Sequence, residues 1–192
     1  MVSSNVFTAP PIFLEPAWAS PFARESWNAA ADVSGSNRNQ DEVRRFTLQS
    51  HAPEARDTAK KPSFILLIED SQADAGLVRE ALLHHSVEGE LLVIRDGDAA
   101  IRYVENIEST ERCPDLVIVD LNLPKRPGRE VLESMRQHPC FRDATVAILS
   151  SSNAEQDRAL AFGFRVSRYI RKPLRLDDFL NLGAVFKSLL TS

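Results

Sequence analysis

The feature that most constrains this chain is the stretch Asp115-Leu-Val-Ile-Val-Asp120-Leu-Asn-Leu-Pro124, in which a short apolar run ends in a carboxylate. Residues 116–119 are consecutive, apolar and mostly β-branched, a pattern typical of a strand buried on both faces of a parallel sheet. Asp120 stands at the carboxyl end of that strand, and Pro124 and Gly128 turn the chain soon afterwards. Ligands bind at the carboxyl ends of strands in open parallel sheets, so Asp120 is the first candidate functional residue.

From Ser63 onward, apolar runs alternate with helical patterns. The runs 63–68, 91–94, 115–119, 145–149 and 168–170 predict strands, and apolar residues at helical spacing follow each of them. Five such units in tandem predict an α/β fold: a five-stranded doubly wound parallel sheet of strand order 2-1-3-4-5 with helices on both faces. Right-handed crossovers then place the carboxyl ends of the strands at one rim.

Helix starts are visible at two further places. Asp98 is expected to cap the second helix, because it ends the turn Arg95-Asp-Gly-Asp98. Ser152 with Glu155 three residues later forms a capping box that predicts a helix after the fourth strand.

Residues 1–62 differ from the rest. They have no fixed periodicity and are interrupted by prolines, which predicts a disordered N-terminal extension before one domain at 63–192. Two alternatives stay open: a translation start placed too far upstream, or a short docking segment in which aromatic residues such as Trp18 and Trp27 are anchors.

Composition excludes several classes. A net charge of −4 gives no basic footprint for nucleic acid, and no apolar run is long enough to cross a bilayer. The N-terminus lacks the pattern of a signal peptide, so we expect a cytoplasmic protein. Cys113 and Cys140 lack metal-type spacing and do not make a disulfide framework, so we expect reduced structural thiols.

Polar side chains collect at the predicted rim. Glu69 and Asp70 follow the first strand, Asp120 the third, Ser150 the fourth and Lys172 the fifth. Three converging carboxylates would raise one another's pKa unless a cation lay between them. Mg²⁺ suits best, because it accepts carboxylate oxygens and also binds phosphoryl groups. Lys172 adds a point charge and Ser150 a hydroxyl donor.

The reaction that fits this set is phosphoryl transfer onto a carboxylate, with Asp120 as the nucleophile. Mg²⁺ and Lys172 would neutralise charge on the transferred group. Ser150 would then turn to bind a phosphoryl oxygen, and Tyr169 would move into the vacated space. Such a local electrostatic change biases a two-state surface, which is how a switch works. Taken singly, each residue is ordinary, as a helix cap, a loop hydroxyl, a surface lysine or sheet packing.

Over about residues 63–192 the sequence resembles the receiver domain of two-component response regulators. The motifs that carry the resemblance are Ile65-Leu-Leu-Ile-Glu69-Asp70, Leu116-Val-Ile-Val-Asp120-Leu-Asn-Leu-Pro124, Ile148-Leu-Ser150 and Tyr169-Ile-Arg-Lys172-Pro173. The resemblance implies a CheY-like fold, a phosphohistidine donor on a sensor histidine kinase, and Asp120 as the phosphoacceptor.

It also implies roles for the neighbouring residues. Lys172 would contact the phosphoryl group, and the Lys172–Pro173 bond would be cis, a geometry that costs little only before proline. The implied Mg²⁺ ligands are Asp70 and Asp120 directly, Glu69 through water, and the backbone carbonyl of Asn122.

Finer motifs narrow the resemblance. The runs 120–132, 95–97 and 150–155 are similar to stand-alone receivers that partner bacterial phytochrome histidine kinases. Ser150 stands where threonine is frequent, which keeps the hydroxyl. Arg165-Val166 replaces the usual Gly-Ala before the last strand, so that face is expected to differ in its contacts.

The predicted last helix ends near Leu190, so the expected output is contact with another protein, or transfer of the phosphoryl group to a histidine phosphotransfer protein. A homodimer is one hypothesis, through a face carrying Arg165, Arg168, Arg171, Phe179 and Phe186; the alternative is ordinary surface arginines and core phenylalanines. Two other functions stay open. Asp120-Leu-Asn122 is similar to the Asp-x-Asp opening of haloacid-dehalogenase-type phosphatases, and a phosphorylation-independent adaptor would keep the fold. Catalysis beyond the chain's own phosphorylation and dephosphorylation is not expected.

Overall fold

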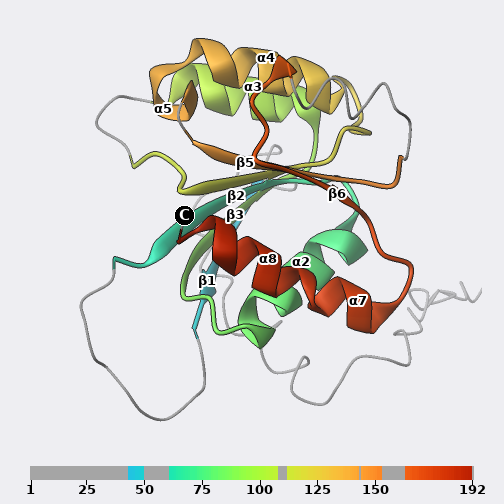
Figure 1. Cartoon of the computed structure of the whole chain (residues 1–192). Helices are drawn as coiled ribbons and strands as arrows, with labels where there is room; N and C mark the ends of the chain where they lie inside the picture. The colour runs from blue at the N-terminus through green and yellow to red at the C-terminus, as the bar shows by residue number, and fades with distance from the viewer. Residues whose placement is uncertain (1–42, 50–60, 108–111, 143, 153–162, 192) are drawn as a thin grey trace, which may run out of the picture. The chain divides into compact units, whose positions relative to one another are not determined.

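The computed structural model describes residues 43–49, 61–107, 112–142, 144–152 and 163–191. These residues form a six-stranded sheet of order β1-β3-β2-β4-β5-β6, with helices on both faces (Figure 1). The strands are β1 (Val43–Leu48), β2 (Ser63–Ile68), β3 (Gly89–Ile94), β4 (Leu116–Val119), β5 (Thr145–Ser150) and β6 (Arg168–Arg171). The helices are α2 (Gln72–His84), α3 (Gly97–Asn106), α4 (Gly128–Gln137), α5 (Pro139–Arg142), α7 (Leu176–Leu180) and α8 (Leu182–Leu189).

The five strands β2 to β6 pair in parallel, in the order expected for a doubly wound sheet. The prediction of a five-stranded sheet is wrong by one strand, because β1 pairs with β3 in antiparallel register, with Val43 opposite Ile94 and Leu48 opposite Gly89. The prediction that residues 1–62 are disordered is therefore wrong for 43–48, while most of that segment lies outside the described residues. β1 escaped prediction because only Leu48 of its six residues is fully buried, which leaves almost no alternation to detect.

Alternate residues of the central strands face two apolar layers. Leu66 and Ile68 of β2 pack towards α3 and α4, whereas Ile65 and Leu67 pack towards α2 and α8. All four are fully buried, as are the residues of β4. This two-sided burial explains why these strands read as unbroken apolar runs, and it holds their carboxyl ends at fixed positions.

The helix starts differ in detail from the expectations. Ser71 caps α2, since its hydroxyl accepts the amide of Asp74 at 3.2 Å. Asp96, not Asp98, caps α3, and its Oδ1 accepts the amide of Ala99 at 2.7 Å. Asp98 lies in the first turn and pairs with Arg102. The helix predicted after Ser152 falls outside the described residues.

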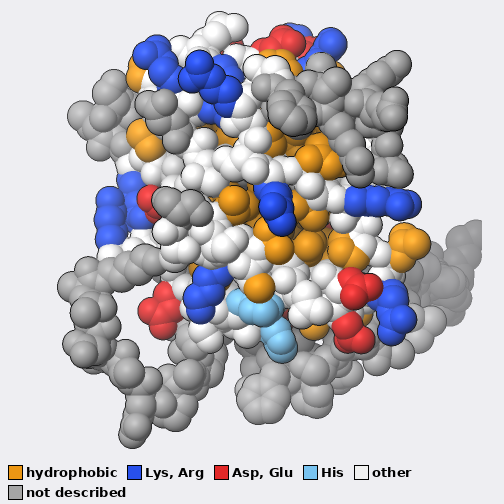
Figure 2. All heavy atoms as spheres, in the orientation of Figure 1, with side chains coloured by type: hydrophobic (Ala, Val, Ile, Leu, Met, Phe, Trp, Pro, Cys, Tyr) orange, Lys and Arg blue, Asp and Glu red, His pale blue; other side chains and the backbone are white. Residues whose placement is uncertain are grey.

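The C-terminal region contains two helices, α7 and α8, where one was predicted. Phe179 and Phe186 are buried against the sheet, so their interpretation as core residues is confirmed and their interpretation as interface residues is wrong. Arg165, Arg168 and Arg171 are exposed. The face shown in Figure 2 carries its basic side chains at separate places, interspersed with acidic ones. No helix in the described part of the chain has the length and apolarity needed to cross a membrane.

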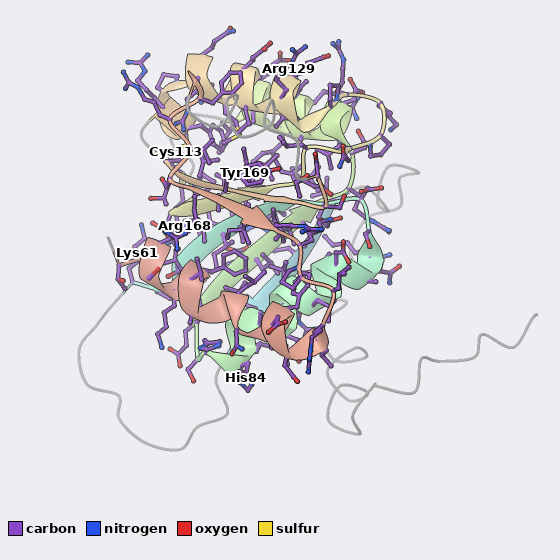
Figure 3. The ribbon with its side chains drawn as sticks, turned by 45° about the vertical axis from the view of Figure 1, so that its right-hand side comes forward. Lys61, His84, Cys113, Arg129, Arg168 and Tyr169 are labelled. Carbon is purple, nitrogen blue, oxygen red and sulfur yellow. A yellow bond between two sulfur atoms is a disulfide. The ribbon has the colours of Figure 1, made fainter. Side chains whose placement is uncertain are left out.

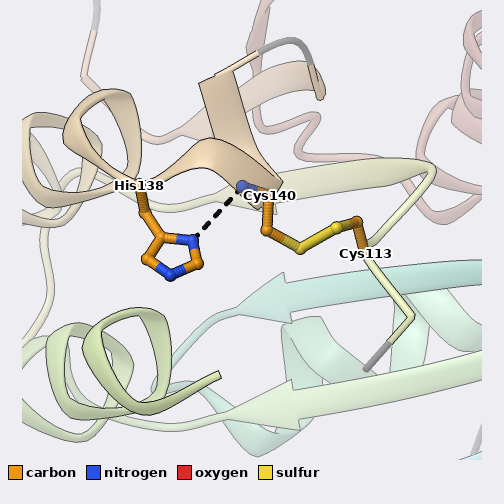
Figure 4. Close-up of a disulfide and its surroundings, with 3 residues drawn as sticks. All are labelled: Cys113, His138 and Cys140. Carbon is orange, nitrogen blue, oxygen red and sulfur yellow. Dashed lines mark hydrogen bonds between the residues drawn. A yellow bond between two sulfur atoms is a disulfide. The ribbon is translucent and has the colours of Figure 1, made fainter. Parts of the chain in front are cut away.

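The prediction of two reduced thiols is wrong, because Cys113 and Cys140 form a disulfide (Figure 4). Their Cα atoms are 5.3 Å apart although 27 positions separate them in the sequence. Cys113 precedes β4 and Cys140 lies in α5, which precedes β5, so the parallel pairing of β4 with β5 brings both to the same end of the sheet. Spacing alone could not show this. Disulfides are rare in cytosolic proteins, so the cysteines give no support to the cytoplasmic expectation.

Candidate phosphorylation site

The carboxyl ends of four parallel strands place the predicted site residues at one rim. Glu69 and Asp70 follow β2, Asp120 follows β4, Ser150 ends β5 and Lys172 follows β6. Backbone hydrogen bonds continue the sheet to these positions: the Asp120 amide donates to Ile68 O at 2.9 Å, and the Lys172 amide donates to Ser150 O at 2.8 Å. The rim is therefore held by the sheet itself and not by a free loop.

The centre of the site is the ammonium of Lys172. Its Nζ donates hydrogen bonds to Asp120 Oδ2 and Asp74 Oδ2, each at 2.7 Å, and lies 2.8 Å from Glu69 Oε2. The side chain of Lys172 is only 12% exposed, while those of Glu69 and Asp120 are 1% and 5% exposed. One buried cation thus serves three carboxylates.

Asp74 is the member of this cluster that the sequence did not predict. Nothing in its local pattern separates it from an ordinary first-turn carboxylate. The available signal was its position: it lies four residues beyond Asp70, in the first turn of the helix that leaves the rim. Its side chain is 28% exposed, the most exposed of the three that Lys172 contacts.

The charges of this cluster perturb one another. Burial raises the pKa of Glu69 to about 7, although the hydrogen bond and charge of Lys172 lower it, and the nearby charge of Asp120 adds to the rise. Burial lowers the pKa of Lys172, but hydrogen bonds to its carboxylate partners, Asp120 first, raise it by more than burial lowers it. The net change in this pKa is upward. Lys172 is therefore charged at every physiological pH, whereas Glu69 titrates near neutrality.

Three carboxylates at this rim offer a site for a hard cation. Glu69, Asp70 and Asp120 each present one oxygen, and these oxygens lie within 4.8 Å of one another. Asp70 is exposed, so the cluster can be reached from solvent. An all-oxygen donor set with several carboxylates and access for water is what Mg²⁺ and similar divalent ions prefer. The residues present fit such an ion.

The loop after Asp120 is shaped by close contacts. The amide of Asn122 donates to Asp120 Oδ1 at 3.0 Å, which fixes the orientation of the carboxylate, and the Asn122 side chain is exposed. Gly128 lies against the same loop, and a Cβ there would come 2.2 Å from Asp120 O. Any larger residue at 128 would displace the backbone that carries Asp120.

The two residues predicted to switch meet at the backbone of Ser152. The fully buried hydroxyl of Ser150 accepts the Ser152 amide at 3.2 Å, and the Tyr169 hydroxyl donates to Ser152 O at 3.0 Å. Tyr169 is half-buried and lies between the sheet and the α3–α4 layer (Figure 3). A rotation of Ser150 would thus release the amide of Ser152, the residue whose carbonyl binds Tyr169.

The cis peptide bond expected before Pro173 is absent, since every peptide bond of the described residues is trans. The two isomers of a bond preceding proline differ by only about 0.5–1 kcal/mol, so local sequence cannot fix the choice. With the trans bond the Lys172 amide still reaches Ser150 and its ammonium still reaches the carboxylates.

Comparisons with known proteins agree with this geometry. Residues 65–182 match the family described as the response regulator receiver domain. Response regulator Rcp1 of Synechocystis sp. is 37% identical over 128 residues, which cover 66% of this chain and 87% of that protein.

Solved structures give the same result. The phosphorylated cyanobacterial phytochrome response regulator RcpA superposes with a TM-score of 0.61 at 34% identity, over 68% of this chain and 94% of that one. The Mn²⁺-bound form of Rcp1 gives a TM-score of 0.60 at 36% identity, over 66% and 93% of the two chains. The bacteriophytochrome response regulator RtBRR gives 0.55 at 32% identity, over 66% and 77%.

Proposed function

Because this chain belongs to the response regulator receiver domain family, we propose that Asp120 accepts a phosphoryl group from a phosphohistidine of a sensor histidine kinase. The observation that carries the proposal is the arrangement around that carboxylate. Asp120 is buried at the end of β4, with its two oxygens held by the Asn122 amide and the Lys172 ammonium. An oriented carboxylate beside a fixed cation is prepared for transfer of a doubly negative group.

In this reaction a carboxylate oxygen of Asp120 attacks phosphorus, the P–N bond to the histidine breaks, and an acyl phosphate forms. Lys172, already 2.7 Å from Asp120 Oδ2, would contact an oxygen of the incoming group. The Asn122 amide keeps the other carboxylate oxygen in place.

Asp70 and Asp120 would hold a divalent ion directly, with Glu69 through water and the Asn122 carbonyl completing the protein ligands. The ion we propose is Mg²⁺, which when bound neutralises charge on the transferred phosphoryl group. The fit rests on the oxygen cluster of this chain, and one relative has been solved with Mn²⁺ bound.

We propose that the phosphoryl group changes the surface through Ser150 and Tyr169. A bound phosphate adds about −1.5 to −2 of charge and strong acceptor oxygens. Ser150 would turn its hydroxyl towards these oxygens and release the Ser152 amide, which loosens the contact of Tyr169 with Ser152 O. Arg165, Arg168 and Arg171 are exposed in β6 and the segment before it, and this is where we propose that a second copy of the chain or a histidine phosphotransfer protein binds.

The kinase that we propose is of the phytochrome type, and its supporting observation is that several similar solved proteins are phytochrome response regulators by name. A phosphatase of the haloacid dehalogenase type is not favoured, because Asp120 follows the third parallel strand and the pair Glu69-Asp70 occupies the first. Since the acidic residues, the hydroxyl and the lysine are all present, a phosphorylation-independent adaptor is not favoured either.

The test is phosphorylation of the full chain by radiolabelled acetyl phosphate and by a panel of histidine kinases that includes a phytochrome kinase. Wild type should take up one base-labile phosphoryl group, and Asp120→Asn should take up none. Asp115→Asn is the matched control, because Asp115 lies at the other end of the same strand and is 46% exposed. Labelling of Asp120→Asn at the wild-type level would refute the assignment, and preference for an unrelated kinase would refute the phytochrome pathway alone.

A further inference from the structure

We propose that Asp74 is a positioning residue: it holds the Lys172 ammonium while the site is unphosphorylated, and it is the carboxylate that Lys172 releases when Asp120 is phosphorylated. This inference rests on the proposed function. We therefore expect phosphorylation to change the contacts of the first turn of α2 as well as those of Ser150 and Tyr169.

The contacts of Lys172 show which bond such a release would break. Its Nζ donates hydrogen bonds to Asp74 Oδ2 and Asp120 Oδ2, each at 2.7 Å, while Glu69 Oε2 lies 2.8 Å away in an ion pair that makes no hydrogen bond. A phosphoryl group on Asp120 adds strong acceptor oxygens that compete for the ammonium. The bond to Asp74 is the one that this competition can replace without loss of the contact with Asp120.

Burial selects which partner is released. Glu69 is 1% exposed, so water compensates poorly for the loss of its contact with Lys172. Asp120 carries the phosphoryl group itself, so contact with it is retained through the new oxygens. Asp74 is 28% exposed, and water can solvate it once Lys172 has moved.

The position of Asp74 in α2 lowers the cost further. It is the third residue of a 13-residue helix, and its amide is bound by the capping hydroxyl of Ser71 at 3.2 Å. A carboxylate in the first turn interacts favourably with the positive end of the helix dipole. Asp74 thus keeps a stabilising environment after release.

The bond that breaks also joins two distant elements. Lys172 follows β6 and Asp74 begins α2, and 98 positions separate them in the sequence. While the bond exists it ties the first turn of α2 to the segment after β6. Its loss should make that turn more mobile, without unfolding a helix that is packed against α7 and α8.

The experiment compares wild type, Asp74→Asn and Asp98→Asn in acetyl phosphate labelling and in hydrogen exchange. Asp74→Asn removes the charge and keeps the size, the backbone amide and its bond to Ser71. Asp98→Asn is the matched control, because Asp98 is also a first-turn carboxylate with a basic partner, Arg102, but lies outside the site. Asp74→Ser is the second variant, because it also removes the carboxylate and leaves the capping Ser71 in place.

In the Asp74 variants, no carboxylate at position 74 competes with the phosphoryl group for the Lys172 ammonium. The phosphodonor also meets less negative charge at the site. Asp74→Asn and Asp74→Ser should therefore be labelled about threefold to tenfold faster than wild type, and Asp98→Asn within about twofold of it. In wild type, phosphorylation should speed exchange of the first-turn amides of α2 by at least about threefold. In both Asp74 variants these amides should exchange fast before phosphorylation and change little after it.

Equal labelling rates in wild type and the two Asp74 variants would overturn the inference and leave the proposed function standing. So would a first turn of α2 that keeps its protection in phosphorylated wild type. Absence of label in wild type, or label that survives Asp120→Asn, would overturn the proposed function and the inference together.

Discussion

The two ends of strand β4 each carry an aspartate, and the two are held in opposite ways. Asp120 at the carboxyl end is 5% exposed and shares a buried ammonium with two other carboxylates. Asp115 at the amino end is 46% exposed, and its Oδ2 accepts the Phe64 amide and an Arg112 N–H, each at 2.6 Å. One carboxylate shares a buried cation, and the other has two donors and water.

The two ends of β4 therefore have different roles: contacts at the amino end stabilise the fold, and the carboxyl end carries the reactive carboxylate. At the amino end, Asp115 joins β4 to β2, and the Cys113–Cys140 disulfide joins the segment before β4 to α5. At the carboxyl end, burial raises the pKa of Glu69 to about 7, and the nearby charge of Asp120 adds to the rise. Charge that opposes folding is concentrated where a ligand can relieve it, and cross-links are concentrated at the other end.

Removal of the buried cation should give the largest effect. Lys172→Ala leaves Glu69 and Asp120 as buried carboxylates without their cation. With a metal chelator at pH 8 we expect a loss of about 3–5 kcal/mol in the free energy of unfolding, measured by urea denaturation. In acetyl phosphate labelling with Mg²⁺ present, the variant should take up no label, whereas wild type should take up label. Lys187→Ala is the control, because Lys187 is an exposed lysine that donates to the His85 carbonyl, and it should change stability by less than about 0.5 kcal/mol. Equal stability of the two variants would show that the carboxylates do not depend on Lys172.

Opening the disulfide should give the next largest effect, at the other end of the strand. Cys113→Ser frees a loop closed over 27 positions, for which chain entropy predicts a loss of about 2–4 kcal/mol in the free energy of unfolding. The rate of acetyl phosphate labelling should stay within about twofold of wild type, because the cross-link lies at the amino end of β4 and the acceptor at its carboxyl end. Cys140→Ser should match Cys113→Ser if the bond between the two is the cause. A large fall in labelling rate with little loss of stability would reverse the contrast between the two ends.

The same contrast explains what could be predicted from sequence. The site residues at this edge of the sheet could be predicted, because each polar residue follows an apolar strand at its carboxyl end. Glu69, Asp120 and Ser150 therefore stand out in the sequence. The order of the parallel strands followed from tandem units and right-handed crossovers.

The features that could not be predicted from the sequence depend on contacts between segments that are far apart in the chain. The disulfide partners are 27 positions apart, β1 pairs with β3 across more than 40 residues, and Asp74 meets Lys172 across 98. Each of these residues looks ordinary in its own window. The trans bond before Pro173 was missed for a different reason: the preference between isomers is small, and resemblance to a family decided the expectation.

The smallest of these predicted effects concerns pH. It measures how much the buried charge of Glu69, at the carboxyl end of the strands, lowers the free energy of unfolding. Because burial raises the pKa of Glu69 from 4.5 to about 7, the folded state keeps a proton that the unfolded state has lost. The contribution of Glu69 to stability is therefore fully present below pH 4.5 and falls as the pH rises through 7. Glu69→Gln carries no titrating group, so in the presence of a chelator it should be more stable than wild type by about 1–3 kcal/mol at pH 8, and the difference should shrink towards pH 5. Urea denaturation of both proteins at several pH values measures this difference. A difference for Glu69→Gln that stays constant with pH would mean that Lys172 keeps Glu69 charged, and that the rim does not oppose folding through this residue.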